Sequence, residues 1–338
     1  MGFTDFPLPS SNGSFCGHRE VFQYLKDYAS KFRLIDKVRL SSNVDRVSFV
    51  DKKWHVTVNN NETATFDFVI VAIGRYATPD FPACFRVDHH FNGTIIPASQ
   101  YRRPQDWTGQ KIVVIGSAQS GTDISIELVD HASHVTLIGS APTPGISSRI
   151  ERLESEWISQ VTESGIVTTS ERQIDADVII VAAGYKYSFP FLDEQTLKVD
   201  QTHRKIQNLY NQIIPTSQPR LGLIGVPIFV LIFPLADYQA KWLIEVWRGN
   251  VQLPSRAQMN LEASKREFGV GNRENIRHFH KLGSDMFAYC QKLADEAGFA
   301  ANTRTMHMLH KHTFSIRSTI DILKVDSTNI GVTTHGAQ

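Results

Sequence analysis

The chain has 338 residues, 41% of them hydrophobic and 20% charged, which is the balance of a globular protein long enough for two domains. Its 35 basic and 34 acidic residues leave a net charge of +1, so the composition argues against a nucleic-acid partner. The three cysteines, Cys16, Cys84 and Cys290, stand far apart and form no Cys-x-x-Cys pair. They exclude a disulfide scaffold and a dithiol active site, and they indicate a reducing compartment.

The sequence predicts neither a secretory signal nor a membrane-crossing segment. Asp5 and two prolines interrupt the first nine residues. The most apolar run, residues 221–235, has 15 residues with two glycines and two prolines, whereas a bilayer-crossing helix needs about 20 apolar residues. We interpret this run as a buried strand and loop, and we expect a soluble protein.

Two segments of the chain repeat one pattern. Residues 67–74 and 177–184 each begin with an aspartate, continue through apolar residues and end at a glycine, Gly74 or Gly184. Such a run is typical of a buried parallel strand, and its glycine lets the backbone approach a ligand at the strand's carboxyl end. Two endings 110 residues apart predict two dinucleotide-binding folds.

The second of these folds can be completed from local patterns. Residues 111–115 read as a strand, residues 122–129 have helical apolar spacing, and residues 134–138 read as the next strand. Between the first strand and the helix lies a glycine-containing loop of Gly116, Ser117, Ala118, Gln119, Ser120 and Gly121. Strand, loop, helix and strand in this order predict a nucleotide site, with the pyrophosphate at the helix N-terminus.

The end of the next strand bears on the choice between NAD and NADP. An NAD site usually places an acidic residue there to bind the ribose hydroxyls. Residues 136–140 contain no acid, which favours NADP, and they contain no arginine for the 2′-phosphate either. Ala118 replaces the middle glycine of the usual loop, so its methyl group would narrow the approach of the backbone to the phosphates.

Other candidate side chains have simpler interpretations. His307, His310 and His312 have no cysteine or acid beside them at ligand spacing, so we interpret them as a helix end and predict no metal site. Trp242 and Trp247 stand at helical spacing and are predicted to lie in the core rather than in a substrate cage.

The first dinucleotide-binding fold is incomplete in this sequence. Gly116 precedes Gly184 by 68 residues, and the same distance before Gly74 falls on Phe6. The surrounding residues 3–9 contain two prolines and cannot form a phosphate-binding loop. We therefore expect the opening strand, loop and helix of this fold to lie outside the chain, before Met1.

Several separate segments resemble the flavin-containing monooxygenases. Residues 3–9 resemble their Phe-Pro-Asp-Phe-Pro segment, and residues 16–29 resemble the helix that follows it. Residues 114–124 are similar to the family's nucleotide loop, with Ala118 as a departure. Residues 182–191 resemble the family's Ala-Thr-Gly-Tyr linker, and residues 223–242 resemble its C-terminal flavin-side region.

The family's identifying motif, Phe-x-Gly-x-x-x-His-x-x-x-Tyr, also has a counterpart. Phe91, Gly93 and Tyr101 occupy its first, third and last positions, and Pro97 stands where the histidine belongs. The resemblance implies that these residues, together with Val44, Gly74 and Gly184, lie near a cofactor. It identifies no catalytic side chain, because the protein's part in this chemistry is to position cofactors.

The resemblance implies an α/β fold with two Rossmann-like dinucleotide-binding domains. The NADP domain is inserted into an FAD domain that is incomplete at its N-terminal side. The implied bounds are residues 1–89 for the first part of the FAD domain, 90–205 for the NADP domain, 206–300 for the second part of the FAD domain and 301–338 for a C-terminal tail.

The resemblance also implies a function. NADPH reduces FAD, and one atom of dioxygen is inserted into a soft nitrogen or sulfur nucleophile of a small molecule, to form an N-oxide or S-oxide. The alternatives are a Baeyer–Villiger or N-hydroxylating monooxygenase, or a truncated nucleotide-binding protein, a fragment without catalytic activity. A homodimer and a cytoplasmic location are further expectations, with peripheral association with the endoplasmic reticulum membrane as an alternative.

Overall fold

A computed structural model describes residues 2–8, 16–86, 90–140, 143, 145–265, 279–308 and 310–311. These residues form two compact units: unit 1 contains those up to Arg75 and those from Tyr187 onward, and unit 2 runs from Tyr76 to Lys186. Unit 2 is therefore inserted into unit 1, as the fold class predicts. The predicted domains are regions that bind FAD or NADP, which the two compact units do not test. The predicted domain bounds therefore stay predictions.

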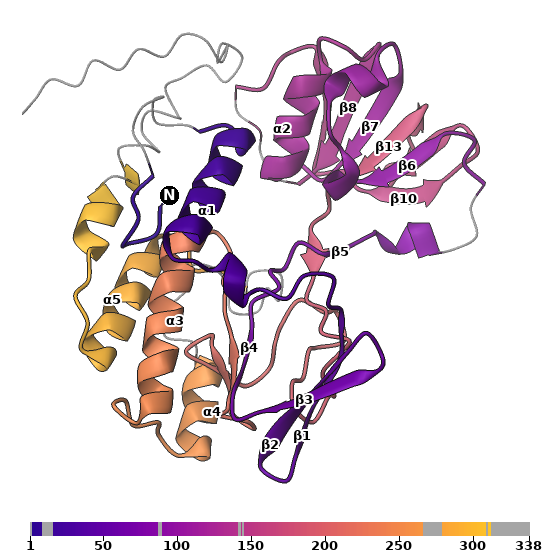
Figure 1. The fold of residues 1–338 in the computed structure, drawn as a ribbon. Coiled ribbons are helices and arrows are strands. Elements are labelled where there is room, and N and C mark those ends of the chain that lie inside the picture. Colours follow the sequence, from indigo (N-terminus) through magenta and orange to yellow (C-terminus); the bar gives the residue numbers. More distant parts are fainter. Residues whose placement is uncertain are drawn as a thin grey trace, which may run out of the picture. The chain divides into compact units, whose positions relative to one another are not determined.

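Unit 2 is built on an entirely parallel five-stranded sheet, in the order β6-β13-β7-β8-β9 (Figure 1). All four residues of β13 are buried valines and isoleucines, the composition expected of a strand covered on both faces. The strands are β6 (Thr94–Pro97), β7 (Lys111–Ile115), β8 (His134–Gly139), β9 (Ile150–Glu154) and β13 (Val178–Val181).

Different elements cover the two faces of this sheet. Helix α2 packs Ile124 and Leu128 against the face that carries Ile112 and Val114. An antiparallel sheet of three strands packs against the other face, which carries Val113. The covering elements are α2 (Gln119–Leu128), β10 (Ile158–Val161), β11 (Gly165–Thr168) and β12 (Gln173–Asp175).

The predicted strand–loop–helix–strand order is confirmed, with a small shift of the helix. Strand β7 has the predicted bounds, and β8 extends one residue beyond its prediction. Helix α2 begins at Gln119 rather than at Thr122, because the exposed polar residues of its first turn carry no apolar periodicity. The remaining short elements of unit 2 are β5 (Thr78–Pro79), β14 (Tyr185–Lys186), η2 (Ala83–Arg86), η3 (Ala98–Gln100) and η4 (Pro104–Trp107).

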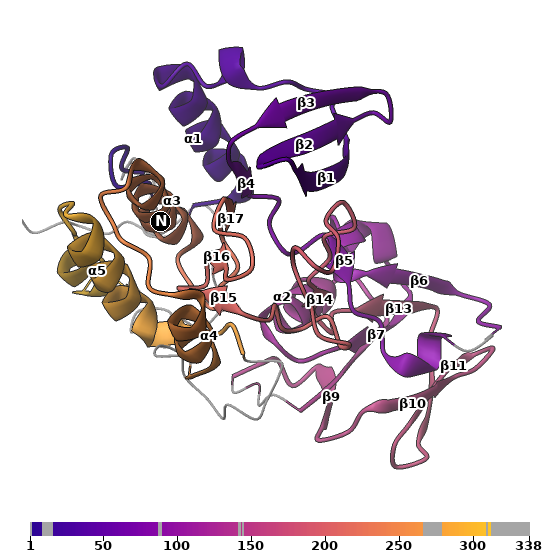
Figure 2. The ribbon, with the colours of Figure 1, turned by 90° about the horizontal axis from the view of Figure 1, so that it is seen from below.

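Unit 1 contains an antiparallel meander and a separate parallel strand pair (Figure 2). The meander, β1-β2-β3, buries Val47 and Trp54 in a core that also includes Leu221. Strand β4 pairs in parallel with β17. The strands of unit 1 are β1 (Val44–Val50), β2 (Lys53–Val58), β3 (Glu62–Phe66), β4 (Val69–Val71), β15 (Leu209–Tyr210), β16 (Ile214–Pro215) and β17 (Leu221–Leu223).

Helices supply the second core of unit 1. Helices α3 and α5 lie side by side in Figures 1 and 2, and their facing residues include Trp242, which is 0% exposed. The prediction that this tryptophan is a core residue is confirmed. The helices of unit 1 are α1 (His18–Lys31), η1 (Ile35–Lys37), α3 (Ile232–Arg248), α4 (Arg256–Lys265), η6 (Gly283–Asp285) and α5 (Met286–Ala297).

The apolar run 221–235 differs in part from its prediction. Its first residues form β17 and a loop, as expected, but α3 begins at Ile232, so the last four residues are helical. Pro234 is compatible with this because it lies in the first turn, where its missing N–H needs no partner. No helix in the described part of the chain is long and apolar enough to cross a bilayer. The predicted tail lies outside the described residues from residue 312 onward.

Candidate nucleotide-binding site

The loop after β7 is shaped by two glycines that no other residue could replace without displacement. Gly116 has φ +111°, and a Cβ placed on it would lie 2.4 Å from the carbonyl oxygen of Ala182. A Cβ on Gly121 would lie 1.7 Å from the carbonyl oxygen of Gly116. The loop therefore turns tightly against β13, and α2 packs close to β7, which is the geometry of a dinucleotide-binding turn.

Between these glycines the loop changes from buried to exposed. Ser117 is 8% exposed, whereas Ala118, Gln119 and Ser120 are exposed. Ala118 is the N-cap of α2, with φ −74° and ψ −177°, and it has no side-chain oxygen to cap the helix. Its extended backbone is ordinary for an alanine, and the exposed start of α2 is suited to an anionic ligand.

The end of β8 explains why the sequence has no acid there. Gly139 is the last residue of β8, and a Cβ placed on it would lie 2.5 Å from both the backbone nitrogen and the side-chain oxygen of Ser117. Any larger residue would push the glycine loop away from the sheet. The position that holds the acid of an NAD site therefore excludes a side chain in this protein.

The strand ending that was recognised at Gly184 lies beside this loop. Val181 pairs with Ile115 in parallel register, and the amide of Ala182 donates to the carbonyl of Ile115 at 2.7 Å. Gly184 follows with φ +98°, and nothing lies within 4 Å of a Cβ placed on it. At position 184 only the left-handed backbone conformation requires a glycine, whereas at position 116 close packing requires it as well.

The segment that resembles the identifying motif forms the outer strand of the sheet and its continuation. A Cβ on Gly93 would lie 2.2 Å from the carbonyl of Asp177 and would also collide with the ring of Phe91. Pro97 ends β6, paired with Val181; β6 is an edge strand, which tolerates the missing N–H. Its pyrrolidine ring has no group that can exchange a proton, unlike the histidine of the motif.

Tyr101, the last residue of this motif, is tied to α2. Its hydroxyl donates to Oε2 of Glu127 at 3.0 Å, and its ring packs against the core under α2. Burial, followed by the nearby Glu127 carboxylate, raises the pKa of the Tyr101 hydroxyl well above its usual range. The tyrosine therefore remains a neutral donor and acts as a structural tie. Glu127 was not predicted from the sequence, because a single polar residue on a helix gives no sign of its partner.

Unit 1 repeats the glycine arrangement at its parallel strand pair. Gly74 follows β4 with φ +72°, and Gly225 follows β17 with φ +82°. The amide of Gly225 donates at 2.8 Å to Oε1 of Gln239, which is 0% exposed and donates in turn to the Tyr289 hydroxyl at 2.8 Å. These two consecutive buried hydrogen bonds, from Gly225 through Gln239 to Tyr289, fix the loop after β17. Sequence patterns did not reveal them.

These residues match one part of a flavin site. The carboxyl ends of two neighbouring parallel strands are where a dinucleotide binds in such sheets, and Gly74 lies there. Val44 lies elsewhere, at the 38% exposed start of β1. Among the described residues of unit 1, no glycine-rich loop connects a parallel strand directly to a helix in the manner of Gly116 to Gly121. The described residues therefore form a complete dinucleotide-binding turn in unit 2, whereas those of unit 1 contribute strand ends without such a turn.

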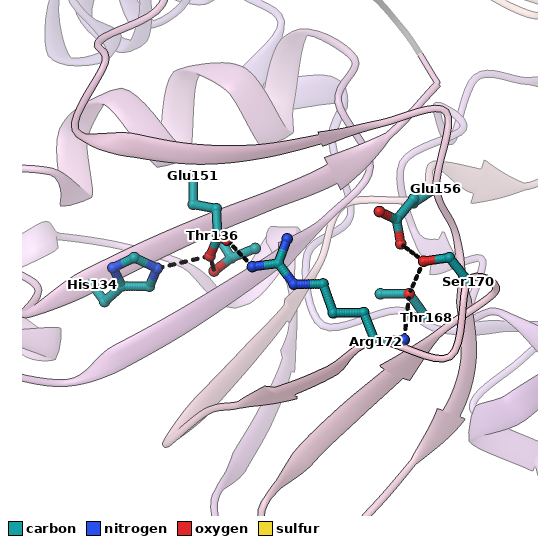
Figure 3. Close-up of polar contacts among 7 residues, drawn as sticks. All are labelled: His134, Thr136, Glu151, Glu156, Thr168, Ser170 and Arg172. Carbon is teal, nitrogen blue, oxygen red and sulfur yellow. Dashed lines mark hydrogen bonds and ion pairs between the residues drawn. The ribbon is translucent and has the colours of Figure 1, made fainter.

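A polar cluster links β8 and β9 of the parallel sheet to the antiparallel sheet (Figure 3). Oε2 of Glu151 on β9 lies 2.9 Å from Nε2 of His134 and accepts a hydrogen bond from the buried Thr136 hydroxyl at 3.0 Å. Arg172 binds the other carboxylate oxygen of Glu151. The contact with His134, assisted by Thr136 and Arg172, lowers the pKa of the Glu151 carboxyl. The cluster joins β8 and β9 to the β11–β12 turn, and its groups satisfy one another.

A second part of the same close-up lies at the neighbouring turn. The Ser170 hydroxyl donates to Glu156 at 2.6 Å and lies 3.0 Å from the Thr168 hydroxyl. The hydrogen bond from Ser170 lowers the pKa of the Glu156 carboxyl. Both groups of residues drawn in Figure 3 therefore tie the turns of the antiparallel sheet to neighbouring elements.

The histidines near the C-terminus have an aromatic partner. The rings of His307 and His310 lie 4.6 and 5.5 Å from the ring of Phe287, centre to centre. His312 lies outside the described residues. Within the residues that the structure describes, no three histidine, cysteine or acidic side chains are grouped so that they could hold a metal ion.

Comparison with known proteins identifies the family. The model of the flavin-binding monooxygenase-like family matches residues 1–155 and 152–314. Flavin-containing monooxygenase FMO GS-OX5 of Arabidopsis thaliana is 31% identical over 321 residues, which cover 88% of this chain and 69% of that protein. Among solved structures, S-allyl-L-cysteine S-oxygenase from Allium sativum has a TM-score of 0.80 at 26% identity, covering 97% of this chain and 78% of that one. Cyclohexanone monooxygenase, with a TM-score of 0.62 at 14% identity over 83% of this chain and 82% of that one, shares the fold. The chain therefore belongs to the flavin-binding monooxygenase-like family.

Proposed function

We propose that this protein is an FAD- and NADPH-dependent monooxygenase that inserts one oxygen atom into a soft sulfur or nitrogen nucleophile of a small molecule. The observation that carries the proposal is the loop from Gly116 to Gly121, whose glycines leave room for a pyrophosphate at the start of α2. Because the chain belongs to the monooxygenase family, we expect the electrons of the bound nucleotide to be used to reduce dioxygen.

The chain's own residues have positioning roles in this proposal. The glycine loop holds the pyrophosphate, and the carboxyl ends of β4 and β17 contribute one edge of the flavin site. Gln239 fixes the Gly225 backbone at that edge. The flavin, when bound, accepts a hydride from NADPH and passes electrons to dioxygen. One oxygen atom joins the substrate and the other leaves as water, with NADPH supplying two electrons.

Sulfur is the favoured nucleophile for a specific reason. The structural relative at 26% identity is named as an S-oxygenase acting on S-allyl-L-cysteine, a thioether. Cyclohexanone monooxygenase is a fold-level relative at 14% identity. Pro97 does not separate the two activities, because the histidine that it replaces belongs to the identifying motif of the flavin-containing monooxygenases as well. On the higher identity of the S-oxygenase, thioether oxygenation ranks above ester formation from a ketone.

The test uses the purified 338-residue protein supplied with FAD, NADPH and S-allyl-L-cysteine under isotopically labelled dioxygen. The expected result is NADPH oxidation that depends on the thioether, with one labelled atom in the sulfoxide by mass spectrometry. A trialkylamine tests nitrogen, and cyclohexanone is the matched ketone control. Ester from the ketone without sulfoxide would reverse the ranking. NADP+ binding without any oxygenation would leave a nucleotide-binding protein.

A further inference from the structure

An arginine that sequence patterns did not connect with the cofactor lies beside the nucleotide loop. Arg152 is on β9, next to β8, and pairs with Leu137 in the parallel register. Ile150 belongs to the core under α2 and Leu153 to the core on the other face. Because side chains alternate along a strand, Arg152 points to the face that α2 covers.

Two contacts direct the guanidinium toward the carboxyl end of the sheet. Its Nη1 lies 3.2 Å from Oε1 of Glu154, the last residue of β9, which pairs with Gly139 at the end of β8. The same nitrogen donates to the carbonyl oxygen of Thr143, in the segment that follows β8, at 3.2 Å. The arginine side chain is 41% exposed, so the guanidinium remains accessible to a ligand.

Thr143 adds a second, independent indication of a ligand. The residue is 6% exposed, and its hydroxyl has no hydrogen-bond partner among the residues that the structure describes. A buried hydroxyl without a partner is unfavourable, and an incoming acceptor would relieve this cost. The unpartnered hydroxyl thus belongs to the same residue whose backbone carbonyl accepts a hydrogen bond from the Arg152 guanidinium.

We infer that Arg152, with Thr143, binds the 2′-phosphate of NADPH and thereby selects NADPH over NADH. When the pyrophosphate lies on the loop after β7, the adenosine ribose lies at the carboxyl end of the next strand, β8. Gly139 at this end excludes a side chain, because its Cβ would collide with Ser117. Gly139 therefore supplies no group that distinguishes the two cofactors, whereas Arg152 on the neighbouring strand β9 places a cation beside this end of the sheet.

Glu154 sets the strength of this selection. Both partners of the Arg152–Glu154 pair are about half exposed, and such pairs contribute little stability, so the guanidinium can exchange the carboxylate for a phosphate at little cost. The carboxylate nevertheless repels a phosphate group. Removing its charge is therefore expected to tighten NADP+ binding, in the direction opposite to the loss of Arg152.

The inference rests on the proposed function, and calorimetric titration of the whole chain with NADP+ and with NAD+ tests both. Arg152→Gln is expected to weaken NADP+ binding about tenfold, the loss of one charge-assisted hydrogen bond, and to leave NAD+ binding unchanged. Thr143→Val is expected to weaken NADP+ binding a few-fold, at the level of one neutral hydrogen bond. Glu154→Gln is expected to tighten it, which does not depend on the folding of the other variants.

The matched control is Arg172→Gln, which removes the same charge from the opposite face of the sheet and should leave the ratio of the two affinities unchanged. An equal loss of NAD+ and NADP+ binding in Arg152→Gln, or no loss at all, would overturn the inference while nucleotide binding stands. If the unaltered protein binds neither nucleotide, both the inference and the proposed function are wrong.

Discussion

Units 1 and 2 both place glycines at the carboxyl ends of neighbouring parallel strands, but only unit 2 has a complete strand–loop–helix turn there. In each, two neighbouring parallel strands end near a glycine with positive φ: Gly116 and Gly184 in unit 2, Gly74 and Gly225 in unit 1. Around Gly116 the structure has closed in, so that a Cβ would meet Ala182 at 2.4 Å, whereas nothing lies within 4 Å of a Cβ on Gly74. Gly184, the counterpart of Gly74 in the repeated sequence pattern, also has no atom within 4 Å of a Cβ placed on it, so the two units differ at the loop after the neighbouring strand and not at the repeated ending.

The strands that carry these glycines differ in the same way. In unit 2, β13 lies between β6 and β7, and all of its residues are buried. In unit 1, β4 pairs with β17 and, within the described residues, with no other strand, and its Ile70 is 43% exposed. The lesson is that a nucleotide loop depends on the packing behind it, which unit 2 supplies from five adjacent parallel strands.

The largest expected effect comes from placing a side chain at Gly116, in the glycine loop of unit 2. Gly116→Val would place a branched side chain at φ +111° and against the Ala182 carbonyl, so the loop must move away from β13. We expect NADP+ binding to fall by at least about a hundredfold, which corresponds to the loss of several pyrophosphate contacts. Calorimetric titration with NADP+ measures it directly.

The control for this change is Gly109→Ala, before β7 in the same unit, which imposes a positive φ on an alanine but meets no neighbouring atom. It should cost about 1–2 kcal/mol of stability and leave the loop in place. Equal losses of NADP+ affinity in both variants would show that backbone strain, and not close packing, makes Gly116 necessary. Unchanged affinity in Gly116→Val would contradict the assignment of the loop.

In unit 1 the corresponding test is the buried side chain of Gln239, which holds the loop after β17. Gln239→Leu preserves the volume of a 0% exposed side chain but removes the acceptor of the Gly225 amide and the donor to the Tyr289 hydroxyl. Leaving a buried amide unpaired should reduce the free energy of unfolding by about 2–3 kcal/mol. The measurement is urea denaturation followed by circular dichroism.

Gln258→Leu is the matched control, because Gln258 makes an exposed hydrogen bond to Glu262 within α4. Its expected effect is within about 0.5 kcal/mol. If the two substitutions destabilise the protein equally, the buried chain from Gly225 to Tyr289 does not hold the loop after β17.

Sequence patterns predicted the parts of the molecule that depend on local spacing. The bounds of β7 followed from an unbroken apolar run, and the loop followed from Gly116 and Gly121. The start of α2 was misplaced because its first turn is polar and exposed. Side-chain pairs were not predictable for a different reason. Gln239 and Tyr289 lie 50 residues apart in the sequence, and only the packing of α3 against α5 brings them together.

The smallest expected effect tests whether the polar cluster of unit 2 adds a pH-dependent tie that the buried chain of unit 1 lacks. Glu151 has a lowered pKa, first because of its contact with His134. Its contribution is therefore present above the unfolded-state pKa of about 4.3 and is lost as the pH falls through the lower, folded-state value. Since the cluster is partly exposed, the difference should be less than about 1 kcal/mol. Glu151→Gln should be less stable than the unaltered protein near neutral pH, and the gap should close on acidification below about pH 4.3, as shown by urea denaturation at a series of pH values. The exposed Glu163→Gln is the control and should show no such convergence. A gap for Glu151→Gln that stays constant down to the acid limit would mean that the carboxylate charge does not contribute to holding β9 to the β11–β12 turn.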